Sequence, residues 1–325
     1  MDEHKPRVLL TGATGFVGGR LLPNLVSNGF QVRCLVRSAS GFAGSLPPGI
    51  KAEPVEGDLL KPGTWEASLD GMDVAFYLVH SMGGRNFSEI KSFAERDQKA
   101  ATHFLKAAEA AGLSRIIYLG GLGELGDSLS EHLASRQEVG RILQSGKVRT
   151  TVLRAANIIG AGGAPFEMLR YMVERVPVMI CPRWVDTPCQ PIAISNVVDY
   201  LAGCLQQEDT AGLSFDIGGP DIISYRELML IYARVRGLRR LVVTVPVLTP
   251  RLSAYWINLM TPVPAGVIMP LVEGLRNTVV CRENRIRGLV PARLVSMEEA
   301  VCTALAETEK GPGRLPSTQS CFRRL

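Results

Sequence analysis

Three glycines near the start of the chain have the spacing of a loop that holds phosphate groups. They follow the apolar run 8–10, which is typical of a buried strand, and they precede apolar positions in residues 16–26 that recur at helical spacing. In such a unit Gly12 permits the tight turn, Gly15 lets a pyrophosphate approach the backbone, and Gly18 lets the helix pack on the strand. The helix N-terminus then faces the phosphates with unpaired amides and a positive dipole. The predicted cofactor-binding residues here are Thr11, Gly12, Thr14, Gly15, Phe16, Val17 and Gly18.

The end of the second predicted strand, residues 31–36, bears on which dinucleotide binds. It is followed by Arg37 and Ser38, with Arg33 close before and no acidic residue beside them in the sequence. At this place an Asp or Glu would bond the ribose 2′-hydroxyl, whereas an Arg accommodates a 2′-phosphate. Arg37 could grip that phosphate with its planar fork, and a solvated arginine is the alternative. We expect the cofactor to be NADP(H) by preference, with NAD(H) also able to bind.

Two further strand ends are expected to reach the same crevice, because ligands lie beyond the carboxyl ends of parallel strands. Asp58 and Leu59 follow the third predicted strand, and Asp58 could bond the adenine amine or cap the next helix instead. Val79 and His80 end the fourth strand and are predicted to line the cofactor, with packing as the alternative for His80. The candidate residues of a substrate pocket are Ser81, Asn157 and Trp184.

Strands and helices must alternate to bring these strand ends together. Six predicted strands alternate with helices up to residue 155, which indicates an α/β fold with a doubly wound parallel sheet of the Rossmann type. We expect a dinucleotide-binding domain at residues 1–160. Residues 161–310 are predicted to form a mixed region that contributes to the sheet and builds a smaller substrate or lid subdomain. The tail, residues 311–325, is predicted to be disordered.

Composition excludes several other classes of protein. The net charge of +5 is mild, and the Lys and Arg residues form no stripe of the kind that binds nucleic acid. The seven cysteines include no C-x-x-C pair and the four histidines show no metal-ligand spacing, so we expect reduced thiols and no metal site. No secretory signal precedes the first strand, which favours a cytoplasmic location.

One stretch, residues 252–272, carries no charge and is long enough to span a bilayer. Pro262, Pro264 and Pro270 interrupt it, so two short helices are expected in place of one span. The stretch could form the wall of a hydrophobic pocket, or it could contact a membrane surface or a protein partner. Peripheral attachment to the inner face of a membrane is therefore an alternative to a purely cytoplasmic location, and the sequence leaves the oligomeric state open.

Several motifs resemble those of the extended short-chain dehydrogenase/reductase family. Residues 11–18, Thr-Gly-Ala-Thr-Gly-Phe-Val-Gly, are similar to its cofactor signature, and Gly57-Asp58-Leu59 resembles its adenine-site motif. Residues 153–160 resemble the sixth-strand motif, with Ala155 where proline is usual. The resemblance covers residues 7–220 well and residues 221–306 loosely. Within the family the chain is similar to an atypical branch that includes the nucleotide-binding accessory subunit of respiratory complex I and bacterial NAD(P)-binding proteins.

The catalytic residues of that family are replaced in this chain. The resemblance implies a Tyr and a Lys four residues later on one helix, but the matching helix carries His132 and Arg136 on one face. Gly120 and Gly121 stand where the family has a serine. We expect His132 to serve as the proton donor, since an imidazole titrates near neutral pH, and Arg136 to hold the nicotinamide ribose. Alternatively, both side chains are structural.

Two functions follow from this pattern. The first is an NADPH-dependent oxidoreductase that transfers hydride between NADPH and a small hydrophobic substrate, namely a carbonyl, an enone or a quinone-like molecule. In that case Ser81 or Tyr118 could supply the hydroxyl that the missing serine would have provided. The second is a non-catalytic NADP(H)-binding protein that has a structural or redox-sensing role and acts through a protein or membrane partner. The missing Tyr, Lys and Ser are the reason to consider it.

Overall fold

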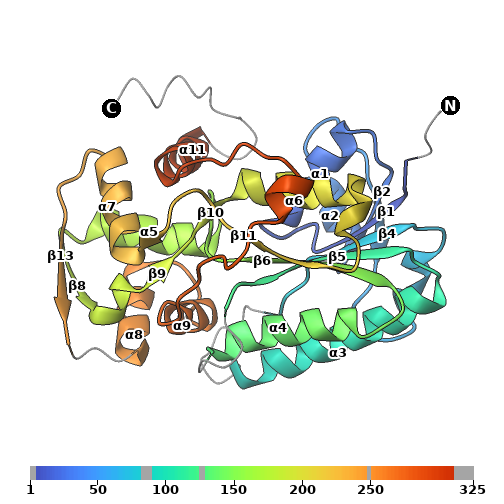
Figure 1. Ribbon diagram of the computed structural model, residues 1–325, viewed down its shortest axis with the longest axis horizontal. Coiled ribbons are helices and arrows are strands. Elements are labelled where there is room, and N and C mark those ends of the chain that lie inside the picture. Colours follow the sequence, from blue (N-terminus) through green and yellow to red (C-terminus); the bar gives the residue numbers. More distant parts are fainter. Residues whose placement is uncertain (1–4, 82–89, 124–128, 247–249, 311–325) are drawn as a thin grey trace.

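A seven-stranded parallel sheet forms the centre of the molecule in this computed structural model, which describes residues 5–81, 90–123, 129–246 and 250–310 (Figure 1). The strand order is β11-β6-β5-β4-β1-β2-β3, so the direction of winding reverses next to β1. The strands are β1 (Val8–Thr11), β2 (Val32–Val36), β3 (Glu53–Glu56), β4 (Val74–Tyr77), β5 (Arg115–Gly121), β6 (Arg149–Ala155) and β11 (Ser214–Ile217). The predicted doubly wound fold is confirmed, and the tail at 311–325 lies outside the described residues.

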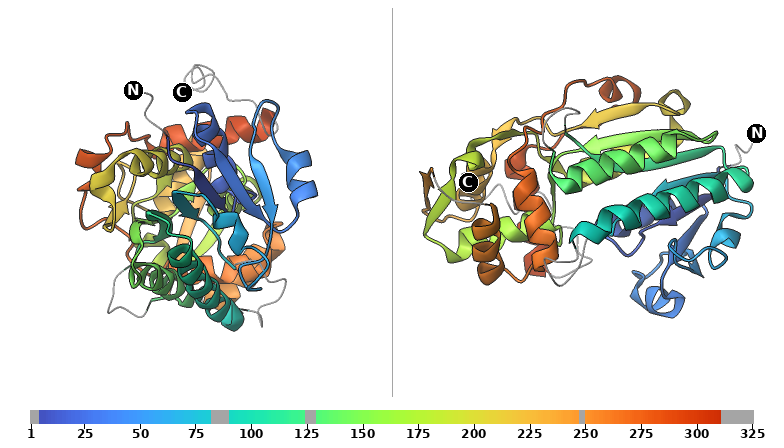
Figure 2. Two further views of the ribbon diagram at one scale, coloured as in Figure 1. Left: turned by 90° about the vertical axis from the view of Figure 1, so that its right-hand side faces the viewer. Right: turned by 90° about the horizontal axis from the view of Figure 1, so that it is seen from below.

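Helices cover both faces of this sheet (Figure 2). On one face lie α1 (Gly18–Ser27), α2 (Ala39–Ser45), α6 (Ile194–Gln206) and the short α10 (Ile286–Leu289). On the other lie α3 (Ile90–Ala110) and α4 (Glu131–Gln144). The central strands are therefore buried on both sides, which explains why Val8, Leu9 and Leu10 form an unbroken apolar run.

The C-terminal region packs at one end of the sheet, on the left in Figure 1. Its core joins buried residues such as Phe166, Leu169, Tyr232 and Val301. Its helices are α5 (Ala164–Arg175), α7 (Tyr225–Val235), α8 (Pro250–Met260), α9 (Ala265–Gly274) and α11 (Met297–Lys310). Its strands form three two-stranded ribbons: β7 (Ile158–Ile159) with β10 (Ile192–Ala193), β9 (Pro188–Cys189) with β12 (Ile223–Ser224), and β8 (Val178–Pro182) with β13 (Leu241–Val245).

The uncharged stretch 252–272 forms two helices, α8 and α9, as its prolines predict. Pro264 is the N-cap of α9 and Pro270 lies inside it. Among the described residues, none of the helices combines the length and the apolar character that crossing a bilayer requires.

The thiols differ from expectation at one position. Cys34, Cys181, Cys189, Cys204 and Cys281 are free. Cys302 is disulfide-bonded, so the expectation of reduced thiols is wrong there.

Candidate functional site

The loop between β1 and α1 has the shape that a pyrophosphate requires. Gly12 adopts a φ of 74°, and a Cβ at this position would lie 2.6 Å from the Leu78 carbonyl oxygen. A Cβ on Gly18 would overlap the carbonyl oxygen of Gly12, and the Gly15 amide donates to that same oxygen at 2.9 Å. Gly12 and Gly18 are thus fixed by a backbone that passes too close for a side chain, and at Gly15 a Cβ would make a tight contact of 3.1 Å with the Gly12 carbonyl oxygen. The loop therefore offers bare backbone and a helix N-terminus to a ligand.

A cavity of about 320 Å³ begins at this loop and ends against the C-terminal region. Phe16 and Val17 line it from the loop, and Gly120 and Gly121 line it at the end of β5. Most of its wall is apolar, and the far side comes from segments that are distant in sequence: Cys189, Tyr225, Leu271, Gly274, Leu275, Asn277 and Val279. The tertiary structure thus encloses a site that combines a phosphate-binding loop with an apolar chamber.

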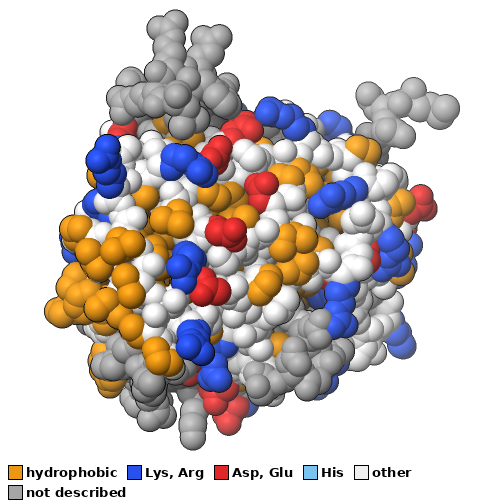
Figure 3. Space-filling model, turned by 60° about the vertical axis from the view of Figure 1, so that its left-hand side comes forward, with side chains coloured by type: hydrophobic (Ala, Val, Ile, Leu, Met, Phe, Trp, Pro, Cys, Tyr) orange, Lys and Arg blue, Asp and Glu red, His pale blue; other side chains and the backbone are white. Residues whose placement is uncertain are grey.

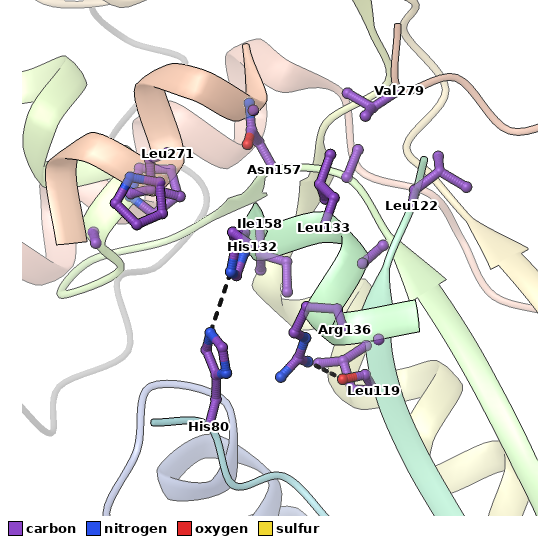
Figure 4. A pocket seen from close by; sticks show the side chains of 18 of the residues that line it. His80, Leu119, Leu122, His132, Leu133, Arg136, Asn157, Ile158, Leu271 and Val279 are labelled. Atoms are coloured by element: carbon purple, nitrogen blue, oxygen red, sulfur yellow. Dashed lines mark hydrogen bonds between the residues drawn. The ribbon is translucent and has the colours of Figure 1, made fainter. Parts of the chain in front are cut away.

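Two histidines and one aspartate form a hydrogen-bonded chain at the wall of this cavity (Figure 4). His80 follows β4, and its Nδ1 donates to Oδ2 of Asp97 at 2.6 Å. Nε2 of His80 and Nδ1 of His132, which lies on α4, share a second hydrogen bond at 3.2 Å. The other oxygen of Asp97 accepts from the Ser81 amide at 2.8 Å. This arrangement leaves Nε2 of His132 as the nitrogen that can exchange a proton with a ligand.

Burial decides the protonation states of the three residues in this hydrogen-bonded chain. It lowers the pKa of His132 well below the usual 6.5, and the neighbouring charges of His80 and Arg136 lower it further. Burial also lowers the pKa of His80, although the bond to Asp97 opposes the shift. For Asp97 burial acts to raise the pKa, but the bonds from His80 and Ser81 outweigh it and lower the pKa overall. Near pH 7 the hydrogen-bonded chain therefore consists of a neutral His132, a neutral His80 and the Asp97 carboxylate.

Arg136 lies one turn after His132 on α4. Its guanidinium donates to the carbonyl oxygen of Leu119 and lies over the Tyr118 ring, 5.2 Å from the centroid. A guanidinium has five N–H donors, so this bond leaves others for a ligand in the cavity that it lines. Arg136 is therefore both anchored to β5 and placed beside the ligand space.

The same part of the chain matches a family model described as NAD(P)H-binding, over residues 12–163. This span contains the glycine loop, the chain of Asp97, His80 and His132, and Arg136. The chain therefore carries an NAD(P)H-binding domain of the Rossmann type.

Proteins of similar sequence include several reductases. It is 23% identical to the divinyl chlorophyllide a 8-vinyl-reductase of Cucumis sativus, over 66% of this chain and 52% of that protein. It is 29% identical to the ceramide reductase of Caulobacter vibrioides, over 53% of this chain and 52% of that protein. The chain thus spans about half the length of these curated relatives. The solved structure of the triphenylmethane reductase of Citrobacter sp. shares the fold, with a TM-score of 0.70, 19% identity, and coverage of 92% of this chain and 99% of that one.

At the places where the short-chain dehydrogenase/reductase family has its catalytic tyrosine, lysine and serine, this chain has His132, Arg136 and the glycines 120 and 121. His132 and Arg136 occupy the places that the sequence assigned to them, on one face of α4. A Cβ at Gly121 would lie 3.1 Å from Cδ2 of Leu133, so a serine there would crowd α4. Tyr118 cannot supply the missing hydroxyl, because it is fully buried and its hydroxyl donates to the Arg136 carbonyl oxygen at 2.9 Å. The expectation that Tyr118 could supply this hydroxyl is wrong.

At the end of β2 the fold places an acidic residue that is distant in the sequence. Arg37 is exposed, and Ser38 caps α2 by accepting from the Gly41 amide. Glu56 on β3 is in register with Val36, and its carboxylate accepts from the Ala39 amide at 3.0 Å. No acidic residue stands beside Arg37 in the sequence, but strand pairing places one near this strand end. Arg37 and Glu56 would compete to set the charge felt by a ribose 2′-substituent.

Arg33 does not share the role of Arg37. Its guanidinium bonds Glu53 at 2.9 Å and the carbonyl oxygens of Ser68 and Asp70. These bonds commit it to the sheet edge, so Arg37 is the residue of this pair that can meet a phosphate.

Some predicted cofactor residues have structural tasks. The Thr11 hydroxyl donates to the Phe76 carbonyl oxygen at 3.0 Å and accepts from the Leu78 amide at 3.1 Å, so it ties β1 to β4 and does not face the cofactor. Leu59 is buried in the core against α3. Asp58 accepts from the Leu60 amide at 3.0 Å and so holds a turn, and the next helical element begins only at Glu66, with Trp65 as its N-cap.

Of the remaining predicted positions, two line cavities and three do not. Asn157 lines the cofactor cavity, as Figure 4 shows, and Ser81 contributes its amide to Asp97. Trp184 lines a second cavity under α8 and is absent from the lining of the first. Val79 packs against the core cluster that α3 covers, and Thr14 is exposed on the loop.

Sequence reasoning missed Asp97, although a signal for it exists. Asp97 lies on the apolar stripe of α3, one turn after Phe93 and one turn before Ala101, where a carboxylate has no reason to be unless it meets a partner. The stretch 252–272, considered as a pocket wall, contributes Leu271 to the cofactor cavity, whereas the wall residues from Gly274 to Val279 were missed and carry no comparable signal.

Proposed function

We propose that this chain is an NADP(H)-dependent oxidoreductase that passes hydride between NADPH and a hydrophobic carbonyl, enone or quinone-like substrate. The observation that carries the proposal is the chain of Asp97, His80 and His132, which ends in an apolar cavity beside a phosphate-binding loop. A bound nicotinamide would supply hydride chemistry there. The names of the relatives support the substrate class, since a vinyl reductase and a ceramide reductase act on large hydrophobic molecules.

His132 would exchange the proton of the reaction. When the imidazole pair holds one extra proton, Nε2 of His132 can donate it to the substrate oxygen or carbon that gains a lone pair. Nδ1 of His132 then takes the proton that it shares with Nε2 of His80, and the pair returns to two neutral rings. Asp97 stabilises the charged state through its 2.6 Å bond to His80. In the opposite direction the same atoms accept a proton from an alcohol.

The other residues would position the reactants. The glycine loop fits a pyrophosphate because a Cβ at Gly12 or Gly18 would occupy the space that the backbone needs. The free donors of Arg136 would hold ribose hydroxyls, and Asn157 would orient a polar group of the substrate. The apolar remainder of the cavity would exclude water from the reacting atoms, which strengthens every hydrogen bond inside it.

The test is single-turnover oxidation of NADPH by the purified chain against a panel of quinones, enones and hydrophobic ketones. We expect loss of nicotinamide absorbance with at least one member of the panel, at a rate that rises with substrate concentration and saturates. A protein that binds NADPH and oxidises it with no compound of these three classes would contradict the proposal.

Arg37 is expected to set the cofactor preference. The variant Arg37→Glu should weaken NADPH binding by about 2 kcal/mol, roughly 30-fold, because it removes a charge-assisted contact and adds repulsion. NADH binding should change little, and Glu56→Gln should strengthen NADPH binding because it removes the acid beside the same strand end. Fluorescence titration with both cofactors measures these values. Equal losses for NADPH and NADH would show that Arg37 does not meet the 2′-phosphate.

A second function, non-catalytic NADP(H) binding, is favoured by one observation. Glycines stand at positions 120 and 121, where the family has its serine, and the hydroxyl of the buried Tyr118 is bonded to the Arg136 carbonyl oxygen. The bound dinucleotide would then act as a structural element or a redox signal to a partner. Retention of NADPH through purification, with no turnover in the panel experiment, would favour this function over the first.

A further inference from the structure

Large apolar side chains lie exposed together on one side of the C-terminal region. They come from the β8 and β13 ribbon and from α8, and we call them the apolar face: Val178, Ile180, Leu241, Val243, Trp256 and Leu259. Leu259 is 73% exposed and Ile180 is 58% exposed, so these side chains are open to solvent and do not belong to the half-buried edge of a core. Figure 3 shows hydrophobic side chains gathered at the left edge of the molecule, where these elements lie.

The two strands of the ribbon are apolar on both surfaces. Residues of a strand alternate in direction, and Met179 and Cys181 point into the core while Val178 and Ile180 point outward. The partner strand repeats this pattern with Val242 inward and its neighbours outward. Outward-facing side chains of a strand that contacts water would ordinarily be polar. The apolar outer side chains of this ribbon therefore indicate a surface that contacts an apolar phase.

A second apolar cavity, of about 430 Å³, lies directly beneath the apolar face. Val178, Ile180 and Trp256 belong both to the face and to the lining of this cavity. At its inner end Tyr225 and Leu275 line this cavity and the cofactor cavity alike. The second cavity is therefore a direct neighbour of the cofactor cavity, and Tyr225 and Leu275 lie between the two.

Exposed arginines lie beside the ends of the two strands of the apolar face. Arg175 and Arg183 flank β8, Arg239 precedes β13, and all three are exposed. Among the described residues, the acids of the same segments are already paired: Glu174 bridges to Arg236 at 3.2 Å and Asp186 bridges to Arg226 at 2.6 Å. The rim of the face is thus left with a positive charge.

We propose that the apolar face docks on a bilayer that contains anionic lipid, and that the cavity beneath it receives a hydrocarbon chain from that bilayer. Exposed apolar and aromatic side chains enter the boundary between headgroups and chains, and arginines at the rim attract anionic headgroups. A second copy of the chain would instead set these arginines against one another. The docking is independent of the proposed reaction. That the hydrocarbon chain in the cavity is the tail of a substrate rests on the proposed function.

The test of docking is co-sedimentation with vesicles, without any substrate. Wild-type protein should bind vesicles of phosphatidylcholine with phosphatidylglycerol, bind pure phosphatidylcholine less, and bind less at high salt. The double variant Ile180→Glu/Leu259→Glu should bind at least tenfold more weakly. Leu213→Glu, at an exposed leucine beside the start of β11, is the matched control and should bind like wild type. Unchanged NADPH titration would show that each variant is folded.

Three outcomes would overturn the docking proposal: no vesicle binding by the wild type, equal binding by the double variant, or self-association that the double variant abolishes while no vesicle binding occurs. The last would assign the face to a second copy of the chain. Vesicle binding does not require turnover. Protein that binds vesicles but oxidises NADPH with no substrate would contradict the proposed function and leave the docking proposal intact.

The cavity is tested with lipids whose chains carry bromine, which quenches tryptophan on contact. In the variant Trp256→Phe the tryptophans are Trp65, which is buried in the core on the α3 side of the sheet, and Trp184, which lines the cavity. Bromolipid vesicles should quench the emission of this variant, and the further change Trp184→Phe should remove the quenching. Absence of quenching in vesicle-bound Trp256→Phe would show that no chain enters the cavity.

Discussion

Replacing His132 with alanine is expected to lower the rate of single-turnover NADPH oxidation by on the order of 10²- to 10⁴-fold, the usual contribution of a positioned acid or base. The reason is that Nε2 of His132 is the end of the proton chain that faces the ligand, while its Nδ1 is held by His80 at 3.2 Å. NADPH affinity should change little, because the glycine loop and Arg37 are untouched. An unchanged rate would remove His132 from the mechanism.

The pH profile separates a proton-transfer role from a structural one. Reduction needs a proton on the imidazole pair, and burial lowers both pKa values below 6.5. The rate should therefore rise as pH falls from 8 and level off only below 6.5, and His132→Ala should lose this dependence. In Asp97→Asn the carboxylate that raises the pKa of His80 is absent, so the inflection should move to lower pH. A profile that is flat between pH 5 and 8 in the wild type would contradict the assignment.

Replacing Gly18 with alanine should abolish measurable NADPH binding and destabilise the fold by about 3 kcal/mol, the cost of severe overpacking. The added Cβ would overlap the Gly12 carbonyl oxygen and crowd its carbon at 2.8 Å. Both are backbone atoms, so no side chain can rotate to make room. The loop and α1 would have to separate, which removes the phosphate cradle. Titration with NADPH and thermal unfolding measure the two effects.

Gly19→Ala is the matched control for this prediction, because it adds the same methyl group one residue later. A Cβ on Gly19 would lie 3.5 Å from the Ala13 carbonyl oxygen, an ordinary contact. Alanine within a helix is favoured over glycine by up to about 1 kcal/mol, so this variant should be as stable as the wild type or more stable and should bind NADPH normally. Comparable losses in both variants would show that the spacing of the loop is not what matters.

The sequence was sufficient for the elements and for the loop because both depend on local chemistry. An apolar run, a turn that only glycine can make and an amphipathic helix specify the first strand, loop and helix without reference to the rest of the chain. The prolines of residues 252–272 likewise predicted two helices in place of one span. Pairing His132 with Arg136 needed only the helical period, which places residues four apart on one face.

Only the tertiary structure decided what these residues meet. Strand order brings Glu56 beside Val36 at the end of β2, although the two are twenty residues apart in the sequence and out of reach of any local pattern. The packing of α3 on the sheet places Asp97 against His80, and α4 adds His132 to the chain. The same packing turned Thr11 into the sheet and enclosed Tyr118, two side chains that the sequence had left available.

The sequence by itself therefore determined the class of fold and the presence of a phosphate-binding loop, because those follow from periodicity and from backbone conformations that few residues adopt. The tertiary structure decided the proton chain, the second cavity and the apolar face, because each joins segments far apart in the sequence. Burial then fixed the chemistry of the site, since removing His80 and His132 from water is what lowers their pKa values.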